Sequence, residues 1–186
     1  NRIIKLYQDR YNFLWIVSYD KKLHRLDLIN DKIINFNFTL QEFNVNGINN
    51  YFVEVSNGDI CVIIEKNYFI KISFKDQIFK LDTFTLKEVK KINFIFNDLK
   101  SGFWVGTDKG LFYYEGDLKN NKQPLIFFKD EIITNYYLTK KCLIIASAQG
   151  FLYKYNYKSK KYEILYDKIQ DYVTSINAYK DSLFLI

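Results

Sequence analysis

The sequence is poor in residues that break or cross-link a chain. Only one proline and seven glycines occur among its 186 residues, and methionine is absent. This composition excludes collagen-like, proline-rich and glycine/serine low-complexity chains. The longest run without a charge, from Cys142 to Tyr153, is much shorter than the roughly 20 apolar residues of a membrane-spanning helix.

Cysteine and histidine are too scarce to build a reactive cluster. The two cysteines, Cys61 and Cys142, fit neither a disulfide-rich scaffold nor a Cys-x-x-Cys metal site, and we expect two free, buried thiols. His24 is the only histidine, which argues against a histidine metal site or a Ser-His-Asp triad. No known catalytic signature is present, so we expect no cofactor, no metal and no catalytic residue.

Arginine is scarce as well, although the chain is basic. The formal net charge is +6, but only Arg2, Arg10 and Arg25 are arginines, and the remaining basic residues are lysines spread along the chain. Recognition of phosphates and base edges usually draws on arginine forks and clustered basic stripes. Nucleic acid is therefore not an expected partner.

Aromatic and branched apolar residues are abundant instead. Hydrophobic residues make up 48% of the chain and aromatic residues 19%, with 17 phenylalanines and 16 tyrosines. Such residues suit pleated sheets, whereas alanine and other strong helix formers are few. No window has a sustained period of 3.6 residues, so we predict an all-β protein without helices.

A repeat of about 42 residues organises the chain. Apolar triplets recur at intervals of 40 to 46 residues, at 14–16, 60–62, 103–105, 143–145 and 183–185. This period is the length of one four-stranded propeller blade. A β-sandwich would explain the density of strands but not the regular recurrence.

Each repeat is predicted to contain four antiparallel strands, which we call A to D from the innermost to the outermost. The A strands are expected at 3–8, 51–55, 92–96, 133–138 and 174–179, the B strands at the triplets, and the D strands at 33–40, 78–86, 124–128 and 162–166. The whole chain is then one propeller segment, with blades at about 1–42, 43–87, 88–130 and 131–170 and a partial fifth at 171–186. Because the fifth is incomplete, and no initiator methionine or leader is recognised, we expect a piece of a larger ring and of a longer protein.

One repeat resembles a known family. Within GFWVGTDKGLFYY, from Gly102 to Tyr114, the segment from Trp104 onward is similar to the two-component regulator propeller repeat, W-[IV]-G-T-x-x-G-L-x-x-[YF]. The segment around Trp15 is a looser copy, with Val17 and Ser18 in place of Gly-Thr, and the other three copies are degenerate.

The resemblance implies a function as well as a fold. Such repeats form seven-bladed propellers in the periplasmic sensor region of Bacteroides-type hybrid two-component systems. The resemblance implies that this segment belongs to an inner-membrane protein whose other parts include a histidine kinase. It also implies a ligand such as an oligosaccharide, and a homodimer of the full-length protein. Similar repeats occur in lyases that act on streptogramin-type antibiotics.

The motif residues themselves have structural roles. Trp15 and Trp104 are expected to pack between adjacent blades. Gly106 allows a close approach, and Thr107 can bond to the backbone of the turn that ends at Gly110.

Ligand candidates come from the loops between strands B and C. In a propeller these loops share one face with the D–A connections, where loops on a rigid scaffold can hold a ligand. The candidates combine polar and aromatic groups that suit a sugar; they are Tyr19, Asp20, Asp108, Lys109 and Gln149, with Lys21, Glu65 and Asn67 nearby.

The leading hypothesis is a non-catalytic sensor segment that recognises a periplasmic ligand, with glycans as the favoured class. One alternative is a scaffold for protein–protein interaction, which would expose a broad aromatic patch. The other is a propeller lyase, for which His24 on a predicted C strand is badly placed.

Overall fold

The computed structural model describes residues 2–39, 52–55, 58–75, 78–98, 102–115, 123–167, 169, 173, 176–179 and 182–185. In these ranges the regular structure consists of β-strands alone, as predicted, and no helix is present that could cross a membrane. The residues expected at the start of two A strands, 51 and 174–175, lie outside the described ranges.

The strands form four sheets of four and one pair. Blade 1 contains β1 (Ile3–Gln8), β2 (Phe13–Ser18), β3 (Lys22–Asp27) and β4 (Lys32–Thr39). Blade 2 contains β5 (Phe52–Glu54), β6 (Ile60–Glu65), β7 (Tyr68–Lys75) and β8 (Ile78–Thr85). Blade 3 contains β9 (Ile92–Asn97), β10 (Phe103–Thr107), β11 (Gly110–Tyr114) and β12 (Leu125–Phe127). Blade 4 contains β13 (Ile133–Leu138), β14 (Cys142–Ser147), β15 (Leu152–Asn156) and β16 (Lys161–Tyr166), and the pair is β17 (Ile176–Tyr179) with β18 (Ser182–Leu185).

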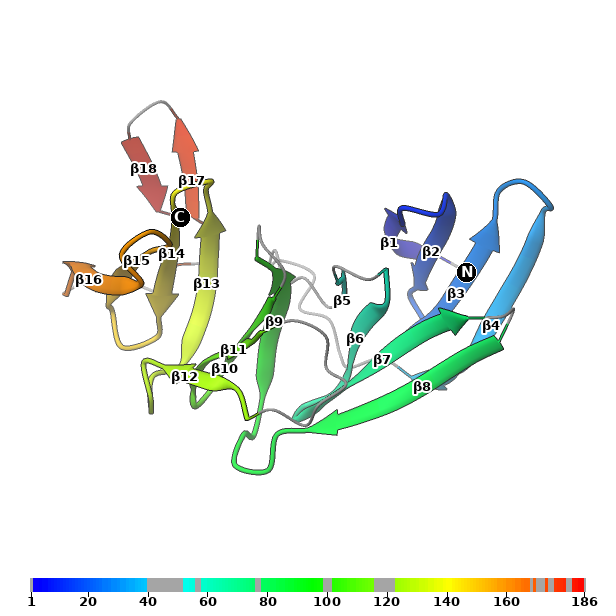
Figure 1. The fold of residues 1–186 in the computed structure, drawn as a ribbon, viewed down its shortest axis with the longest axis horizontal. Coiled ribbons are helices and arrows are strands. Elements are labelled where there is room, and N and C mark those ends of the chain that lie inside the picture. The colour runs from blue at the N-terminus through cyan, green and yellow to red at the C-terminus, as the bar shows by residue number, and fades with distance from the viewer. Residues whose placement is uncertain are drawn as a thin grey trace.

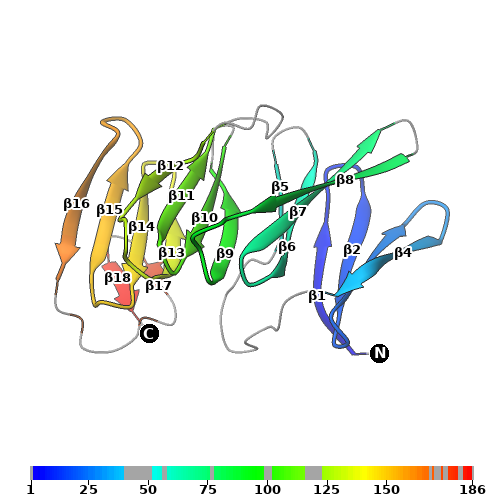
Figure 2. The same cartoon turned by 90° about the horizontal axis from the view of Figure 1, so that it is seen from below.

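Every sheet is an antiparallel meander. In each, the strands pair in chain order, so each has one inner and one outer edge. Figure 1 shows that the sheets stand side by side along an arc, with β1, β5, β9 and β13 on its concave side and β4, β8 and β16 toward the outside. The view in Figure 2 shows the strands of successive sheets running roughly parallel to one another. The predicted propeller architecture is confirmed.

The hydrophobic core lies between the sheets, not within one. Four clusters of buried residues each join two neighbouring units: blades 1 and 2 through Trp15 and Ile60, blades 2 and 3 through Phe69 and Phe103, blades 3 and 4 through Trp104 and Leu143, and blade 4 with the last pair through Ile144 and Ile176. Burial of apolar area on both faces of a sheet therefore fixes each blade against its neighbours.

Both tryptophans pack between blades, as expected from the repeat. Trp15 and Trp104 are each 2% exposed. Trp15 stacks on Phe36 of its own blade and shares its cluster with β6 and β7 of blade 2. Trp104 meets Tyr155 of blade 4 edge to face, with 5.6 Å between ring centroids.

The small residues of the motif also have the predicted roles. A Cβ atom at Gly106 would lie 2.2 Å from the Phe94 ring, so only glycine lets that ring cross the strand. Gly110 has a φ of 121°, which other residues rarely adopt. The Thr107 hydroxyl donates to the Gly110 carbonyl at 2.8 Å and accepts from the Lys109 N–H at 2.9 Å.

The cysteine prediction needs one correction. Neither cysteine forms a disulfide with the described residues, and Cys61 is fully buried in β6, but Cys142 is only half-buried. Cys142 opens β14 at the end of the A–B turn, where its sulfur lies 3.3 Å from the Thr139 hydroxyl. Its position at the rim of the sheet, not in the packed middle, explains the exposure.

Candidate functional site

The five loop candidates lie on one end of the blades, which we call the B–C face. Tyr19 and Asp20 connect β2 to β3, Asp108 and Lys109 connect β10 to β11, and Gln149 lies between β14 and β15. The opposite end, with the A–B and C–D connections, is the A–B face.

A recurring backbone contact ties the B–C loops to the strand entries. The first residue after strand B donates its N–H to the carbonyl before strand A: Tyr19 to Arg2 at 2.7 Å, Asp108 to Lys91 at 3.1 Å, and Ala148 to Ile132 at 2.8 Å. The same bond in three blades shows that this face is a regular scaffold built by the repeat.

Three of the candidate side chains hold that scaffold together. The Asp108 carboxylate accepts from the N–H groups of Lys90 and Lys91 at 3.0 and 3.1 Å. The Gln149 side-chain oxygen accepts from the Ile132 N–H at 3.1 Å. The Lys109 ammonium lies 3.6 Å from an Asp130 oxygen. Each of these contacts joins a B–C loop to a D–A connection.

The other two candidates belong to blade 1. Tyr19 is 64% exposed. A carboxylate oxygen of Asp20 lies 3.6 Å from the Lys22 ammonium. The pKa of Asp20 is held below its ordinary value, chiefly by a hydrogen bond from Ser18. Tyr19, the one aromatic residue among the five candidates, therefore exposes its ring on this face.

His24 is engaged within its own blade. Its Nε2 lies 3.1 Å from the Ser18 hydroxyl and its Nδ1 lies 2.6 Å from the Asn35 side-chain oxygen. The order hydroxyl, imidazole, amide resembles a catalytic triad, but Ser18 is only 4% exposed and also bonds the Lys22 carbonyl at 3.2 Å. Thr107 occupies the same place in blade 3 with no histidine nearby in the sheet, so the hydroxyl belongs to the turn.

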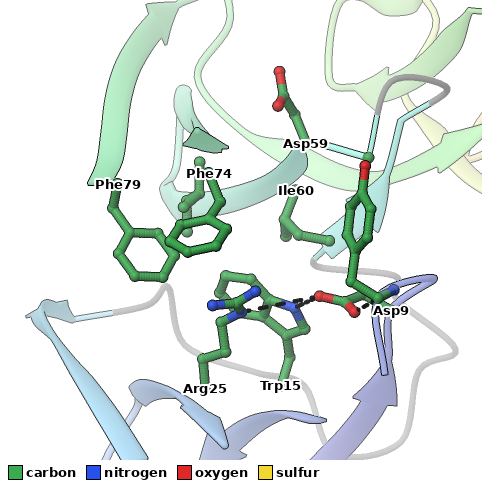
Figure 3. Close-up of a pocket in the computed structure, with 10 residues that line it drawn as sticks. Asp9, Trp15, Arg25, Asp59, Ile60, Phe74 and Phe79 are labelled. Atoms are coloured by element: carbon green, nitrogen blue, oxygen red, sulfur yellow. Dashed lines mark hydrogen bonds and ion pairs between the residues drawn. The ribbon is translucent and has the colours of Figure 1, made fainter. Parts of the chain in front are cut away.

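The A–B face holds a pocket that the sequence reasoning missed. It lies between blades 1 and 2 and has a volume of about 30 Å³. Its walls come from two A–B turns and the end of the β7–β8 hairpin, with strand residues beneath them. Figure 3 shows Asp9, Trp15 and Arg25 on the blade 1 side and Asp59, Phe74 and Phe79 on the blade 2 side.

Asp9 organises the blade 1 wall of the pocket. One of its oxygens accepts from the N–H groups of Tyr11 and Phe13 at 2.9 and 3.0 Å, and the other accepts from the Trp15 indole at 2.8 Å. The aspartate is 5% exposed. Its carboxylate therefore fixes both the turn and the tryptophan.

Arg25 is a buried cation between aromatic rings. Its side chain is 3% exposed, and its guanidinium carbon lies 3.3 Å from the Phe13 ring centroid and 4.7 Å from that of Phe74. The Nε atom makes no hydrogen bond, and Asp9 Oδ2 lies 4.0 Å from it. Burial lowers the pKa of Arg25, and the charge of Asp9 opposes that shift.

The blade 2 wall carries its own ion pair. The Lys71 ammonium, 4% exposed, lies 3.7 Å from Asp59 and 3.6 Å from Asp82. Gly58 also belongs to this wall, and the Tyr11 ring covers it so closely that a Cβ atom there would lie 2.7 Å from the ring.

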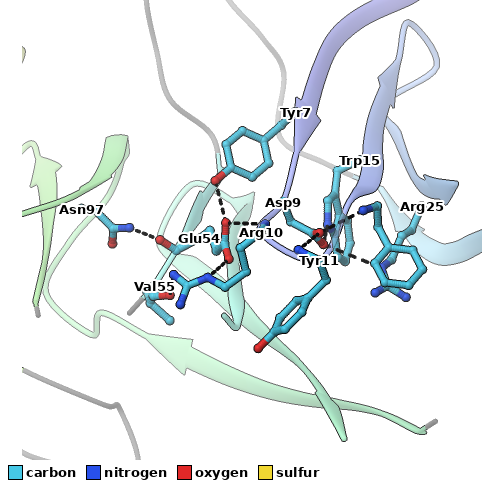
Figure 4. A network of polar contacts seen from close by, with 10 residues as sticks. Tyr7, Asp9, Arg10, Tyr11, Trp15, Arg25, Glu54, Val55 and Asn97 are labelled. Carbon is cyan, nitrogen blue, oxygen red and sulfur yellow. Dashed lines mark hydrogen bonds and ion pairs between the residues drawn. The ribbon is translucent and has the colours of Figure 1, made fainter. Parts of the chain in front are cut away.

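A second polar network beside the pocket joins three blades (Figure 4). The Glu54 carboxylate accepts from the Tyr7 hydroxyl at 3.0 Å and from the guanidinium of Arg10, and the Glu54 carbonyl accepts from the Asn97 amide. Burial and the contact with Glu54 raise the pKa of Tyr7 to about 12. Glu54 thus bridges the A strands of blades 1 to 3.

A sequence signal for the pocket existed. Arg25 and Lys71 are charged residues at equivalent positions of two C strands, each paired with the central residue of the strand B triplet, Trp15 and Cys61. Aspartates in the A–B turns of both blades supply the partners.

Searches of protein-family descriptions and of curated proteins find no match to this chain. Solved structures do match. The extracellular domain of the putative hybrid two component system BT4673 from B. thetaiotaomicron has a TM-score of 0.68 and 17% identity over 100% of this chain and 27% of its own. The Dos1 propeller has a TM-score of 0.68 and 16% identity over 94% of this chain and 48% of its own.

The chain is a β-propeller segment. It spans about a quarter of the length of the first matching structures, which are extracellular domains of Bacteroides two-component or one-component systems. The propeller is also similar to an inactive histidine-to-alanine form of virginiamycin B lyase from Staphylococcus aureus with quinupristin, at a TM-score of 0.65 and 9% identity over 99% of this chain and 62% of that one. The predicted likeness to sensor propellers is confirmed for the fold.

Proposed function

We propose that this propeller is a non-catalytic, ligand-recognising segment of the extracytoplasmic sensor of a hybrid two-component system. The observation that carries the proposal is the match over the whole chain to extracellular domains of two such systems from B. thetaiotaomicron, BT4673 and BT3049. The tryptophan–glycine–threonine repeat of blade 3 supports it from the sequence side.

The blades provide a stiff frame for such a task. Each is locked to its neighbour by a buried apolar cluster, so loops at either face keep fixed relative positions. A ligand that binds one arrangement of the full-length protein more tightly shifts the population toward it. The histidine kinase that reads this shift, and a dimer that carries it across the inner membrane, belong to other parts of the proposed protein.

The ligand class that we propose is a periplasmic glycan. On the B–C face, Tyr19 offers an exposed ring for stacking, and Asp20 lies next to it in the same loop. Polar atoms on the same face of blades 3 and 4 come from Asp108, Lys109 and Gln149. Since Asp108 and Gln149 are held by backbone N–H groups, their positions are preorganised, which lowers the entropy cost of binding.

Two other functions have one observation each in their favour. The likeness to virginiamycin B lyase favours a lyase, but both ring nitrogens of His24 are engaged by Ser18 and Asn35. The outer strand β16 favours a protein-binding scaffold, because all six of its residues are exposed, among them Tyr162, Ile164 and Tyr166.

Isothermal titration calorimetry of the full-length protein against oligosaccharides from plant, host and microbial glycans tests the proposal. We expect saturable binding of one glycan, weakened about tenfold by Tyr19→Ala, which corresponds to about 1.4 kcal/mol. Lys158→Ala, an exposed lysine in the β15–β16 turn, is the control and should leave the affinity unchanged. A folded protein that binds no glycan would move the assignment to a scaffold.

A further inference from the structure

The pocket between blades 1 and 2 goes beyond the proposed function, because it lies on the opposite face from the loop candidates. It combines a concave site, aromatic walls and a few fixed polar groups, which are the usual features of a small-molecule site. Three properties of its lining decide what it would take.

The first property is an unsatisfied donor. The Arg25 side chain is 97% buried, and its Nε–H has no hydrogen-bond partner in the described structure. A buried donor without a partner destabilises the folded state. Because neighbouring atoms cover this nitrogen, an acceptor oxygen in the pocket would reach it only after a small shift of the Arg25 side chain.

The second property is the charge balance. Arg25 lies near Asp9, and Lys71 lies near both Asp59 and Asp82. The two cations therefore face three carboxylates, of which Asp9 and Asp59 line the pocket. An anionic ligand would meet Asp9 and Asp59 as well as Arg25. A neutral group that both donates and accepts, such as a hydroxyl, fits this mixture better than a carboxylate or a phosphate.

The third property is the shape. The volume of about 30 Å³ holds about two water molecules, or one hydroxyl-bearing substituent in their place. Exposed rings surround this space: Tyr11 is 56% and Phe74 is 46% exposed. A sugar ring could lie against these aromatic faces while one of its hydroxyl groups enters the pocket.

We propose that this pocket is a subsite for a neutral sugar, in which Arg25 and Asp59 bond one inserted hydroxyl or hydroxymethyl group and the Tyr11 ring covers the sugar from outside. Trp15 and Asp9 position Arg25 and do not need to touch the sugar.

The test is calorimetry of the full-length protein with D-glucose, D-galactose, D-mannose and N-acetyl-D-glucosamine, with D-glucuronate as the anionic comparison. We expect one neutral sugar to bind and glucuronate to bind at least tenfold more weakly. Tyr11→Ala should weaken binding about tenfold. Tyr162→Ala removes an equally exposed tyrosine on the outer strand of blade 4 and should leave the affinity within twofold.

A second variant distinguishes loss of the sugar contact from loss of folding. Arg25→Lys keeps the charge but removes the Nε–H and the planar fork, and it should weaken the neutral sugar about tenfold while circular dichroism stays unchanged. Tighter binding of glucuronate than of every neutral sugar would overturn the ligand class. Sugar binding that responds to Tyr19→Ala but not to Tyr11→Ala would overturn the subsite and leave the proposed function standing. If oligosaccharides and simple sugars both fail to bind, the subsite and the glycan proposal both fail.

Discussion

Blades 1 and 3 place a tryptophan at the same point of strand B but surround it differently. Trp15 pairs in register with Arg25, and Trp104 pairs in register with Tyr113. In blade 1 the turn aspartate Asp9 accepts from the indole, whereas in blade 3 the Trp104 indole has no hydrogen-bond partner among the described residues.

The turn aspartate of blade 3, Asp98, bonds a tyrosine and not the tryptophan. Asp98 accepts from the Tyr113 hydroxyl at 2.7 Å, and burial together with this contact raises the pKa of Tyr113. Trp104 is then enclosed by Tyr113, Phe127 and Tyr155. The blade that follows the repeat motif most closely is sealed with aromatic rings, and the blade that departs from it holds a buried cation and a pocket. Departures from the repeat, not the repeat itself, mark the candidate site.

The largest effect is expected from the turn aspartates. Asp9→Ala leaves Arg25 buried without its nearby carboxylate and removes the acceptor of the Trp15 indole, so it should lower the local stability of β1–β3 by about 3–5 kcal/mol. Asp98→Ala removes hydrogen bonds from two neutral donors to the carboxylate but leaves no buried cation behind, so it should cost about 1.5–3 kcal/mol in β9–β11. Native-state hydrogen exchange measures both. Equal losses in the two blades would contradict the distinction.

Substitution of the tryptophans should also destabilise blade 1 more than blade 3, but by a smaller difference. Trp15→Phe and Trp104→Phe remove the same atoms, but the first also leaves an Asp9 oxygen without its donor, whereas the second deletes an N–H that has no partner. Trp15→Phe should therefore cost roughly 1–2 kcal/mol more. Urea titration followed by hydrogen exchange in each blade separates the two values, and a reversed order would refute the comparison.

The glycine of the motif sharpens the contrast in packing. Gly106→Ala puts a methyl group into the Phe94 ring and should destabilise blade 3 by about 1–3 kcal/mol. The double variant with Phe94→Leu provides space and should recover part of the loss. Blade 1 has Val17 in register with Leu23 at this point, so it needs no such gap. If the double variant recovers nothing, the close approach is not the reason for the glycine.

The smallest effect concerns alkaline pH. The pKa of Tyr7 is raised to about 12, above its ordinary value of 10.0. The stability that this shift reflects is complete below pH 10 and is lost as the pH rises toward 12, because the unfolded chain releases the proton first. The melting temperature of blade 1 should therefore fall less between pH 10 and pH 12 in Tyr7→Phe than in the wild type. A fall as steep as in the wild type would exclude Tyr7 as its source.

The fold was predictable because packing repeats along the chain. The strands at Ile3–Gln8 and Ile133–Leu138 were predicted with their observed bounds, since each is a run rich in apolar and aromatic residues that ends in a short polar turn. Thr107 and Gly106 follow from the motif for the same reason. These features depend on contacts within one repeat.

The pocket was not predictable in the same way. Phe74 and Phe79 reach Arg25 from the next blade, and Tyr11 covers Gly58 across the same boundary. Such contacts depend on how two dissimilar blades pack against each other. The repeat spacing of about 42 residues predicts the blades but not the side chains that meet between them. The half-buried Cys142 was missed for a related reason, because the repeat gives the strand but not how far its first residue lies from the packed centre.

The measurement that tests the account most directly is hydrogen exchange of the full-length protein with and without a saturating neutral sugar. The account predicts slower exchange at 10–15 and 58–60, which line the pocket between blades 1 and 2, and unchanged exchange at 102–106, the strand around Trp104 in the sealed blade 3. Protection confined to blade 3, or no protection in either blade at a sugar concentration that saturates binding, would contradict it.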